Sequence, residues 1–181
     1  MGNIKKLSVE LANQIAAGEV VERPASAVKE LIENSLDAGA KRIAIFIEFG
    51  GKRSIRIEDD GIGMNGDDVA LAFDRHATSK LRNFEDLTSI VTLGFRGEAL
   101  PSIASVSRVT LRTRVQGMPH GTEICVDGGV AQPTRQVGMP QGTAIAVEDL
   151  FYNVPVRRKF LKSDGAETSQ ISKVVNQIAL G

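Results

Sequence analysis

Residues with specialised chemistry are scarce in this chain. It has one cysteine, two histidines and no tryptophan among 181 residues. A lone cysteine cannot form an internal disulfide, and so few Cys and His side chains cannot assemble a zinc site. Cys125 lies in an apolar, strand-like pattern, so we interpret it as a small buried side chain. The composition fits a reducing compartment.

An excess of charge of either sign is also missing. The 22 Lys and Arg residues balance 22 Asp and Glu residues, so the total charge points neither to nucleic acid nor to a membrane surface. The N-terminus lacks the long apolar stretch of a signal peptide, and no apolar run approaches the length of a membrane span. We therefore expect a cytoplasmic protein with no membrane association.

Two common catalytic motifs are absent too. The chain contains no Gly-x-x-x-x-Gly-Lys-Ser/Thr loop and no Gly-x-Ser-x-Gly elbow, which excludes P-loop nucleotide binding and the common serine hydrolases. Neither His76 nor His120 has an acidic residue and a nucleophile at sequence positions that would indicate a catalytic histidine. Any nucleotide pocket in this chain must therefore be of another kind.

Apolar periodicity and turn residues predict an α+β fold. Pro24 suits the first turn of a helix, Gly39 suits a left-handed cap at its end, and Gly50-Gly51 predicts a hairpin. Hairpins that follow helices favour an antiparallel or mixed sheet with helices on one face. We expect helices at Ser8–Gly18, Pro24–Ala38, Asp67–Ala77 and Ala166–Leu180, a turn at Asp164-Gly165, and strands at Arg42–Phe49, Ser54–Glu58, Val106–Val115, Thr122–Val126, Val130–Val137 and Thr143–Glu148.

The first candidate site residues are Glu30 and Asn34, four positions apart on one predicted helix. Hydrolysis of a phosphoanhydride needs a carboxylate that deprotonates water, and Mg²⁺ held against phosphates needs few protein ligands, so one carboxamide oxygen suffices. The spacing brings both groups to the same cavity. By periodicity alone, a solvated helix face is the more common explanation.

The second block is Asp59-Asp60-Gly61-Ile62-Gly63, directly after a strand-like run. A carboxylate at a strand end accepts the exocyclic amine of adenine, whereas guanine presents an oxygen there. Gly61 and Gly63 allow the backbone to approach a flat base. The alternative is a plain Asp-Gly turn. Of the two acidic residues, Asp60 is the predicted turn residue and Asp59 is the better candidate ligand.

The third block, Gly94-Phe95-Arg96-Gly97-Glu98, has the character of a phosphate cradle that leads into a helix near Glu98. Arg96 either binds phosphate or pairs with an acidic neighbour. Thr78-Ser79-Lys80 suits a closing lid or an ordinary exposed helix end. Thr143 either hydrogen-bonds the base or merely starts a strand.

Two basic clusters offer a different function. Arg108, Arg112 and Arg114 share one face of a strand, and a second cluster comprises Arg157, Arg158, Lys159 and Lys162. Either could meet DNA phosphates, and either could be a solvated surface.

Long stretches of the sequence resemble the MutL DNA mismatch repair proteins. Shorter signals around Asn34, Asp59 and Gly97 resemble the wider GHKL superfamily, which takes its name from gyrase, the Hsp chaperone, histidine kinases and MutL. The specific stretches are Leu11–Val21, Asn34–Ala40, Arg75–Lys80, Gly94–Leu100 and Leu150–Leu161.

The resemblance implies a Bergerat-type two-layer α/β sandwich that binds Mg-ATP and occupies residues 1–181. It implies that Glu30 is the general base, Asn34 the Mg²⁺ ligand and Asp59 the adenine contact, with Gly63 beside it. Thr143 would complete the base site. The phosphates would be wrapped by Thr78, Ser79, Lys80, Gly94, Phe95, Arg96, Gly97, Glu98, Ala99 and Leu100.

The resemblance also implies a larger protein. Because the chain stops at Gly181 directly after a helical pattern, we expect a fragment that lacks a second domain and a C-terminal dimerisation domain. The whole protein would be an ATP-driven switch that links mismatch-recognition proteins to strand-processing proteins. It would form a homodimer, associate through its N-terminal parts when ATP binds, and bind DNA weakly.

Two other functions remain open. One is a DNA-binding or scaffold module with a non-hydrolysing nucleotide pocket, which the basic clusters would serve. The other is the ATP domain of a topoisomerase or kinase, which shares the pocket but lacks the Leu150–Leu161 block.

Overall fold

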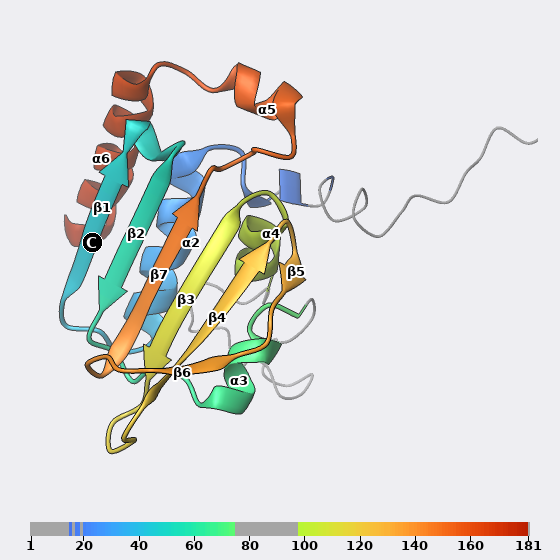
Figure 1. Ribbon diagram of the computed structural model, residues 1–181. Helices are drawn as coiled ribbons and strands as arrows, with labels where there is room; N and C mark the ends of the chain where they lie inside the picture. Colours follow the sequence, from blue (N-terminus) through green and yellow to red (C-terminus); the bar gives the residue numbers. More distant parts are fainter. Residues whose placement is uncertain (1–14, 16, 19, 75–97, 181) are drawn as a thin grey trace, which may run out of the picture.

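The computed structural model describes residues 15, 17–18, 20–74 and 98–180 of the chain. They form an antiparallel sheet with helices on one face, as the sequence predicts (Figure 1). The strands are β1 Ile43–Glu48, β2 Ser54–Asp59, β3 Arg108–Arg114, β4 Gly121–Asp127, β5 Val130–Ala131, β6 Arg135–Val137 and β7 Gly142–Glu148. Their order is β1-β2-β7-β3-β4-β5, and β6 also pairs with β4.

The longer helices are α2 Pro24–Asp37 and α6 Asp164–Leu180. The shorter ones are α3 Gly66–Leu71, α4 Ala99–Ser105, α5 Pro155–Phe160 and the 3₁₀ turn η1 Phe49–Gly51. Helices α2 and α4 contact the sheet on one face, and α6 packs against α2 and η1 (Figure 1). Among the described elements, no helix covers the opposite face.

Helix α2 begins and ends where the local signals predict. Pro24 occupies the first turn, where a missing N–H costs nothing. At the other end Gly39 has φ +69°, its N–H donates to Leu36 O at 2.9 Å, and the N–H of Ala40 donates to Ser35 O at 3.1 Å. This pair of bonds is the Schellman arrangement, which favours glycine at the left-handed position.

The core lies between the helix layer and the inner face of the sheet. Its sheet side includes Ile55, Ile57, Val109, Leu111, Ile124, Ile145 and Val147, and its helix side includes Val28, Leu31, Ile32 and Ile103. Alternation along the strands puts every second side chain on this face. The predicted stripe of α2 is confirmed for Val28, Leu31, Ile32 and Ser35, whereas Leu36 is 39% exposed.

Three element predictions need correction. Val130–Val137 is two short strands, because Pro133 lies between them and has no N–H for a ladder. Asp164 and Gly165 form the first turn of α6 instead of a separate turn. Helix α5 was not predicted, although Pro155 marks its start.

Two other predictions are only partly covered by the described residues. Helix α3 ends at Leu71, and the predicted continuation beyond residue 74 lies outside them. So does most of the predicted helix Ser8–Gly18, of which residues 15, 17 and 18 are helical. No helix in the described part of the chain is long and apolar enough to span a bilayer.

Candidate nucleotide site

A row of polar side chains crosses three neighbouring strands at one end of the sheet. Asp59 ends β2 and stands opposite Thr143 of β7, which stands opposite Thr113 of β3. Residues opposite each other in an antiparallel pair point to the same face. Since Ile57 and Leu111 are core residues two positions earlier on their strands, this row faces the helix layer.

The carboxylate of Asp59 is held by donors from three segments. Its Oδ1 accepts the N–H of Gly61 at 2.9 Å and the N–H of Thr143 at 3.3 Å. Its Oδ2 accepts the hydroxyl of Ser35 at 2.8 Å, which links the strand end to α2. These bonds fix the carboxylate as an acceptor and leave Oδ2 with capacity for a further donor.

Asp60 plays a different part. Its Oδ1 accepts the N–H groups of Lys41 and Arg42 at 2.8 and 2.9 Å, so its side chain closes the turn between α2 and β1. These backbone bonds, with Arg42 first and Lys41 second, hold the pKa of the Asp60 carboxyl below its usual value. The sequence predicts Asp60 as the residue of an Asp-Gly turn. In the structure Asp59 makes the side-chain bond to Gly61 N–H, two residues on, and Asp60 instead binds the segment between α2 and β1. The nucleotide role of Asp59 remains a prediction.

Gly63 lies where no other residue fits. Its φ is +72°, and a Cβ there would stand 2.3 Å from Arg114 O. The backbone is therefore left-handed and in close contact with β3. This close approach brings the loop after Asp59 alongside the polar row.

Glu30 and Asn34 lie one turn apart on α2, and both side chains are partly buried. A freely solvated helix face would leave them exposed. Ser35, the neighbour of Asn34, binds Asp59 directly, so the α2 segment that carries the two predicted catalytic groups is tied to the predicted base contact. Their roles as general base and Mg²⁺ ligand remain predictions.

Most of the predicted phosphate-binding residues belong to segments that the structure does not describe. Thr78, Ser79, Lys80, Gly94, Phe95, Arg96 and Gly97 lie outside the described residues. Glu98 is the N-cap residue of α4, which confirms the predicted helix start, and Ala99 and Leu100 form its first turn. All three are partly buried.

Two participants were missed by the sequence reasoning. Ser35 belongs to the stripe of α2 that the sequence predicts as core-facing, and Thr113 is not among the predicted site residues. A hydroxyl within an otherwise apolar repeat was the available signal in both cases, because such a group needs a partner when it is buried.

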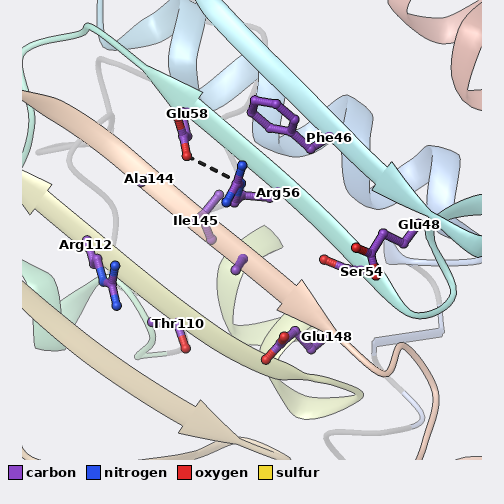
Figure 2. A pocket seen from close by; sticks show the side chains of 11 residues that line it. Phe46, Glu48, Ser54, Arg56, Glu58, Thr110, Arg112, Ala144, Ile145 and Glu148 are labelled. Carbon is purple, nitrogen blue, oxygen red and sulfur yellow. Dashed lines mark ion pairs between the residues drawn. The ribbon is translucent and has the colours of Figure 1, made fainter.

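The hollow in Figure 2 lies away from this row. It has a volume of about 480 Å³ on the helix-free face of the sheet, and none of the predicted nucleotide residues lines it. Its charged side chains are Arg56, Arg112, Glu48, Glu58 and Glu148. Arg56 pairs with Glu58 at 3.4 Å, and the excess of carboxylates makes this hollow a poor site for polyphosphate.

The arginines of β3 share one face of the strand, as predicted. It is the helix-free face, and all three side chains are engaged there. Arg108 pairs with Asp149 at 2.7 Å, Arg112 pairs with Glu123 at 2.5 Å, and Arg114 donates to a backbone carbonyl at 3.2 Å. A guanidinium already neutralised by a carboxylate contributes little to DNA phosphate binding. Arg108 and Arg112 therefore give the DNA-binding alternative little support.

Glu123, on β4, is a buried carboxylate on that face. It is 1% exposed and pairs with Arg135 and Arg112, each at 2.5 Å. The hydrogen bond from Arg135, together with that from Arg112, holds the pKa of Glu123 below its usual value despite burial. The carboxylate therefore stabilises the fold only while it is ionised.

Acid is expected to weaken the fold through this group. The pKa of Glu123 is lower in the folded protein than in the unfolded chain. The stabilisation is therefore complete at pH values above the pKa of the unfolded chain, and it is lost as the pH falls through the pKa of the folded protein. Glu123→Gln should lower the free energy of unfolding by about 1–2 kcal/mol at pH 7. Urea unfolding at pH 7 and pH 3 should show this difference shrinking in acid. Exposed Glu148→Gln is the control, and an equal difference at both pH values would contradict the assignment.

Comparisons with known proteins agree with one another. Residues 22–129 match the family described as histidine kinase-, DNA gyrase B-, and HSP90-like ATPase. The chain is 63% identical to the DNA mismatch repair protein MutL of Koribacter versatilis over 99% of its own length, and 58% identical to that of Solibacter usitatus. It spans only 28% and 27% of those two proteins.

Solved structures show the same similarity. The Aquifex aeolicus MutL ATPase domain complexed with ADP is 40% identical, with a TM-score of 0.69 over 89% of this chain and 56% of that one. The N-terminal domain of a DNA repair protein is 30% identical, with a TM-score of 0.75 over 91% of this chain and 47% of that one.

Proposed function

Because this chain belongs to the histidine kinase-, DNA gyrase B- and HSP90-like ATPase family and corresponds to the N-terminal ATPase region of MutL, we propose that it binds and hydrolyses ATP. In the whole protein, ATP binding would act as a switch between mismatch recognition and strand processing. The proposal includes a cytoplasmic location, homodimerisation and weak DNA binding by the full-length protein.

The observation that carries this proposal is the fixed carboxylate of Asp59. Three donors hold it at the end of β2, and Oδ2 keeps acceptor capacity. An exocyclic amine is the complement of such an acceptor, and adenine has one at the position where guanine has an oxygen. The residues present therefore fit an adenine base.

The groups for hydrolysis would come from α2. The Glu30 carboxylate would take the proton of the attacking water, which needs a base held in place near the phosphates. The Asn34 carboxamide oxygen would be the protein ligand of Mg²⁺, which neutralises charge on the phosphates when bound. Mg²⁺ keeps water or phosphate oxygens as ligands, so one amide together with phosphate oxygens would be enough to hold it.

Titration calorimetry with a non-hydrolysable ATP analogue tests the proposal. We expect the analogue to bind more tightly in the presence of Mg²⁺. Asn34→Ala should remove this gain in affinity, which is about tenfold because one charge-assisted contact is lost. Exposed Asn176→Ala, on α6, is the matched control. No heat of binding from a folded wild-type chain would reject the proposal, and an unchanged Mg²⁺ effect in Asn34→Ala would reject the role of Asn34.

A further inference from the structure

Thr113 is a buried hydroxyl at the centre of the polar row. It is 0% exposed and lies on the same face of β3 as Leu111 and Val109. Its Oγ1 accepts the N–H of Met64 at 2.9 Å, reaches Gly142 O at 3.1 Å and reaches Thr143 Oγ1 at 3.0 Å. One side chain thus joins the loop after Gly63 to the start of β7.

These three contacts determine where the hydroxyl protons go. A carbonyl oxygen only accepts, so the contact with Gly142 O requires the proton of Thr113. The two lone pairs of Thr113 then accept from Met64 N–H and from the hydroxyl of Thr143. The reverse direction would leave the oxygens of Thr113 and Gly142 facing each other without a proton. Only the first assignment satisfies all three contacts together.

Thr143 is consequently left as an acceptor. Its single proton is directed at Thr113, and its side chain is partly exposed whereas Thr113 is not, so a ligand could contact Thr143 but not Thr113. Its backbone neighbour across the strand pair is Asp59, whose Oδ2 is also an acceptor. A base that meets this corner of the site encounters acceptors only.

We propose that Thr113 is a positioning residue that sets the hydrogen-bond polarity of Thr143 and so makes the site select a 6-aminopurine over a 6-oxopurine. This inference rests on the proposed nucleotide site. An amine has two protons for the two acceptors, whereas an oxo group would oppose them with lone pairs. Without the Thr113 oxygen, the Thr143 hydroxyl is free to rotate and donate, and the discrimination weakens.

The test compares ADP with inosine diphosphate, which carries oxygen in place of the amine. Thr113→Val removes the hydroxyl with little change of shape. We expect the ratio of the two affinities, measured by calorimetry, to fall about fivefold or more, which is the size of one neutral hydrogen bond. Thr113→Ser keeps the hydroxyl and should restore the wild-type ratio. The ratio is the readout, because a loss of packing alone would weaken both nucleotides alike.

The matched control is Thr110→Val. Thr110 lies on the same strand but faces the other side of the sheet, with Cys125 Sγ at 3.8 Å. Its substitution should leave the ratio unchanged. If thermal unfolding shows that Thr113→Val does not fold, Thr113→Ala provides the same loss of hydroxyl.

Two results would overturn the inference, and they are distinguishable. A wild-type ratio retained in the folded Thr113→Val or Thr113→Ala protein would reject the role of Thr113 and leave the nucleotide site standing. A folded wild-type chain that binds neither nucleotide would reject the nucleotide site and the inference with it.

Discussion

Asp59→Asn is expected to lower nucleotide affinity at least about a hundredfold while the fold is retained. The donors around Asp59 dictate how the new amide sits. Two N–H groups, from Gly61 and Thr143, meet Oδ1, so the amide oxygen must take that place. The NH₂ group then replaces Oδ2, the atom with spare acceptor capacity.

The fold tolerates this change better than the ligand does. Ser35 loses Asp59 as an acceptor, but its hydroxyl also contacts Leu31 O at 3.2 Å and can donate there. An adenine amine has no such alternative, because it would meet a donor where it needs an acceptor. Calorimetry with a non-hydrolysable ATP analogue measures the affinity, and thermal unfolding checks the fold.

Asp60→Asn provides the control for this experiment. It is the same substitution one residue later, in a side chain that binds the backbone of Lys41 and Arg42. It should leave the affinity near that of the wild type. Equal losses in the two variants would mean that the loop as a whole is responsible, and unchanged affinity in Asp59→Asn would remove Asp59 from the base site.

Glu30→Gln is expected to have a similarly large effect on turnover alone. Replacing a general base by a neutral amide should slow ATP hydrolysis about 10²- to 10⁴-fold, because the amide cannot accept the proton of the attacking water. Nucleotide affinity should stay close to the wild-type value, since this role concerns water and not the base. Steady-state phosphate release by the full-length protein is the measurement, because this chain spans only 28% of its relative from Koribacter versatilis.

The control for Glu30 comes from the same helix. Asp37 is exposed near the end of α2, and Asp37→Asn makes a comparable change of charge there. It should leave hydrolysis within about twofold, as expected for a surface substitution. Hydrolysis by Glu30→Gln at the rate of the control would assign the base role to another group.

The solved structures add a context for both experiments. They include a MutL ATPase domain with ADP, of which this chain covers 56%. We expect nucleotide binding to be measurable with the present chain, and hydrolysis to be tested more sharply with the full-length protein.

The sequence by itself determined the features that depend on near neighbours. Pro24 and Gly39 delimited α2, and Gly50-Gly51 indicated the β1–β2 hairpin, because capping and turn conformations are set within a few residues. The α+β class followed from the order of these elements.

Tertiary structure decided the features that depend on strand pairing across the chain. Asp59 and Thr143 are 84 residues apart, yet strand register places them in one row with Thr113, and Met64, 49 residues before Thr113, contacts that row from a loop. No local pattern specifies register between such distant strands, so neither the role of Thr113 nor the Ser35–Asp59 bond was visible beforehand. The direction of a hydroxyl proton follows only when all its partners are in place, because one donor and two lone pairs must be satisfied together.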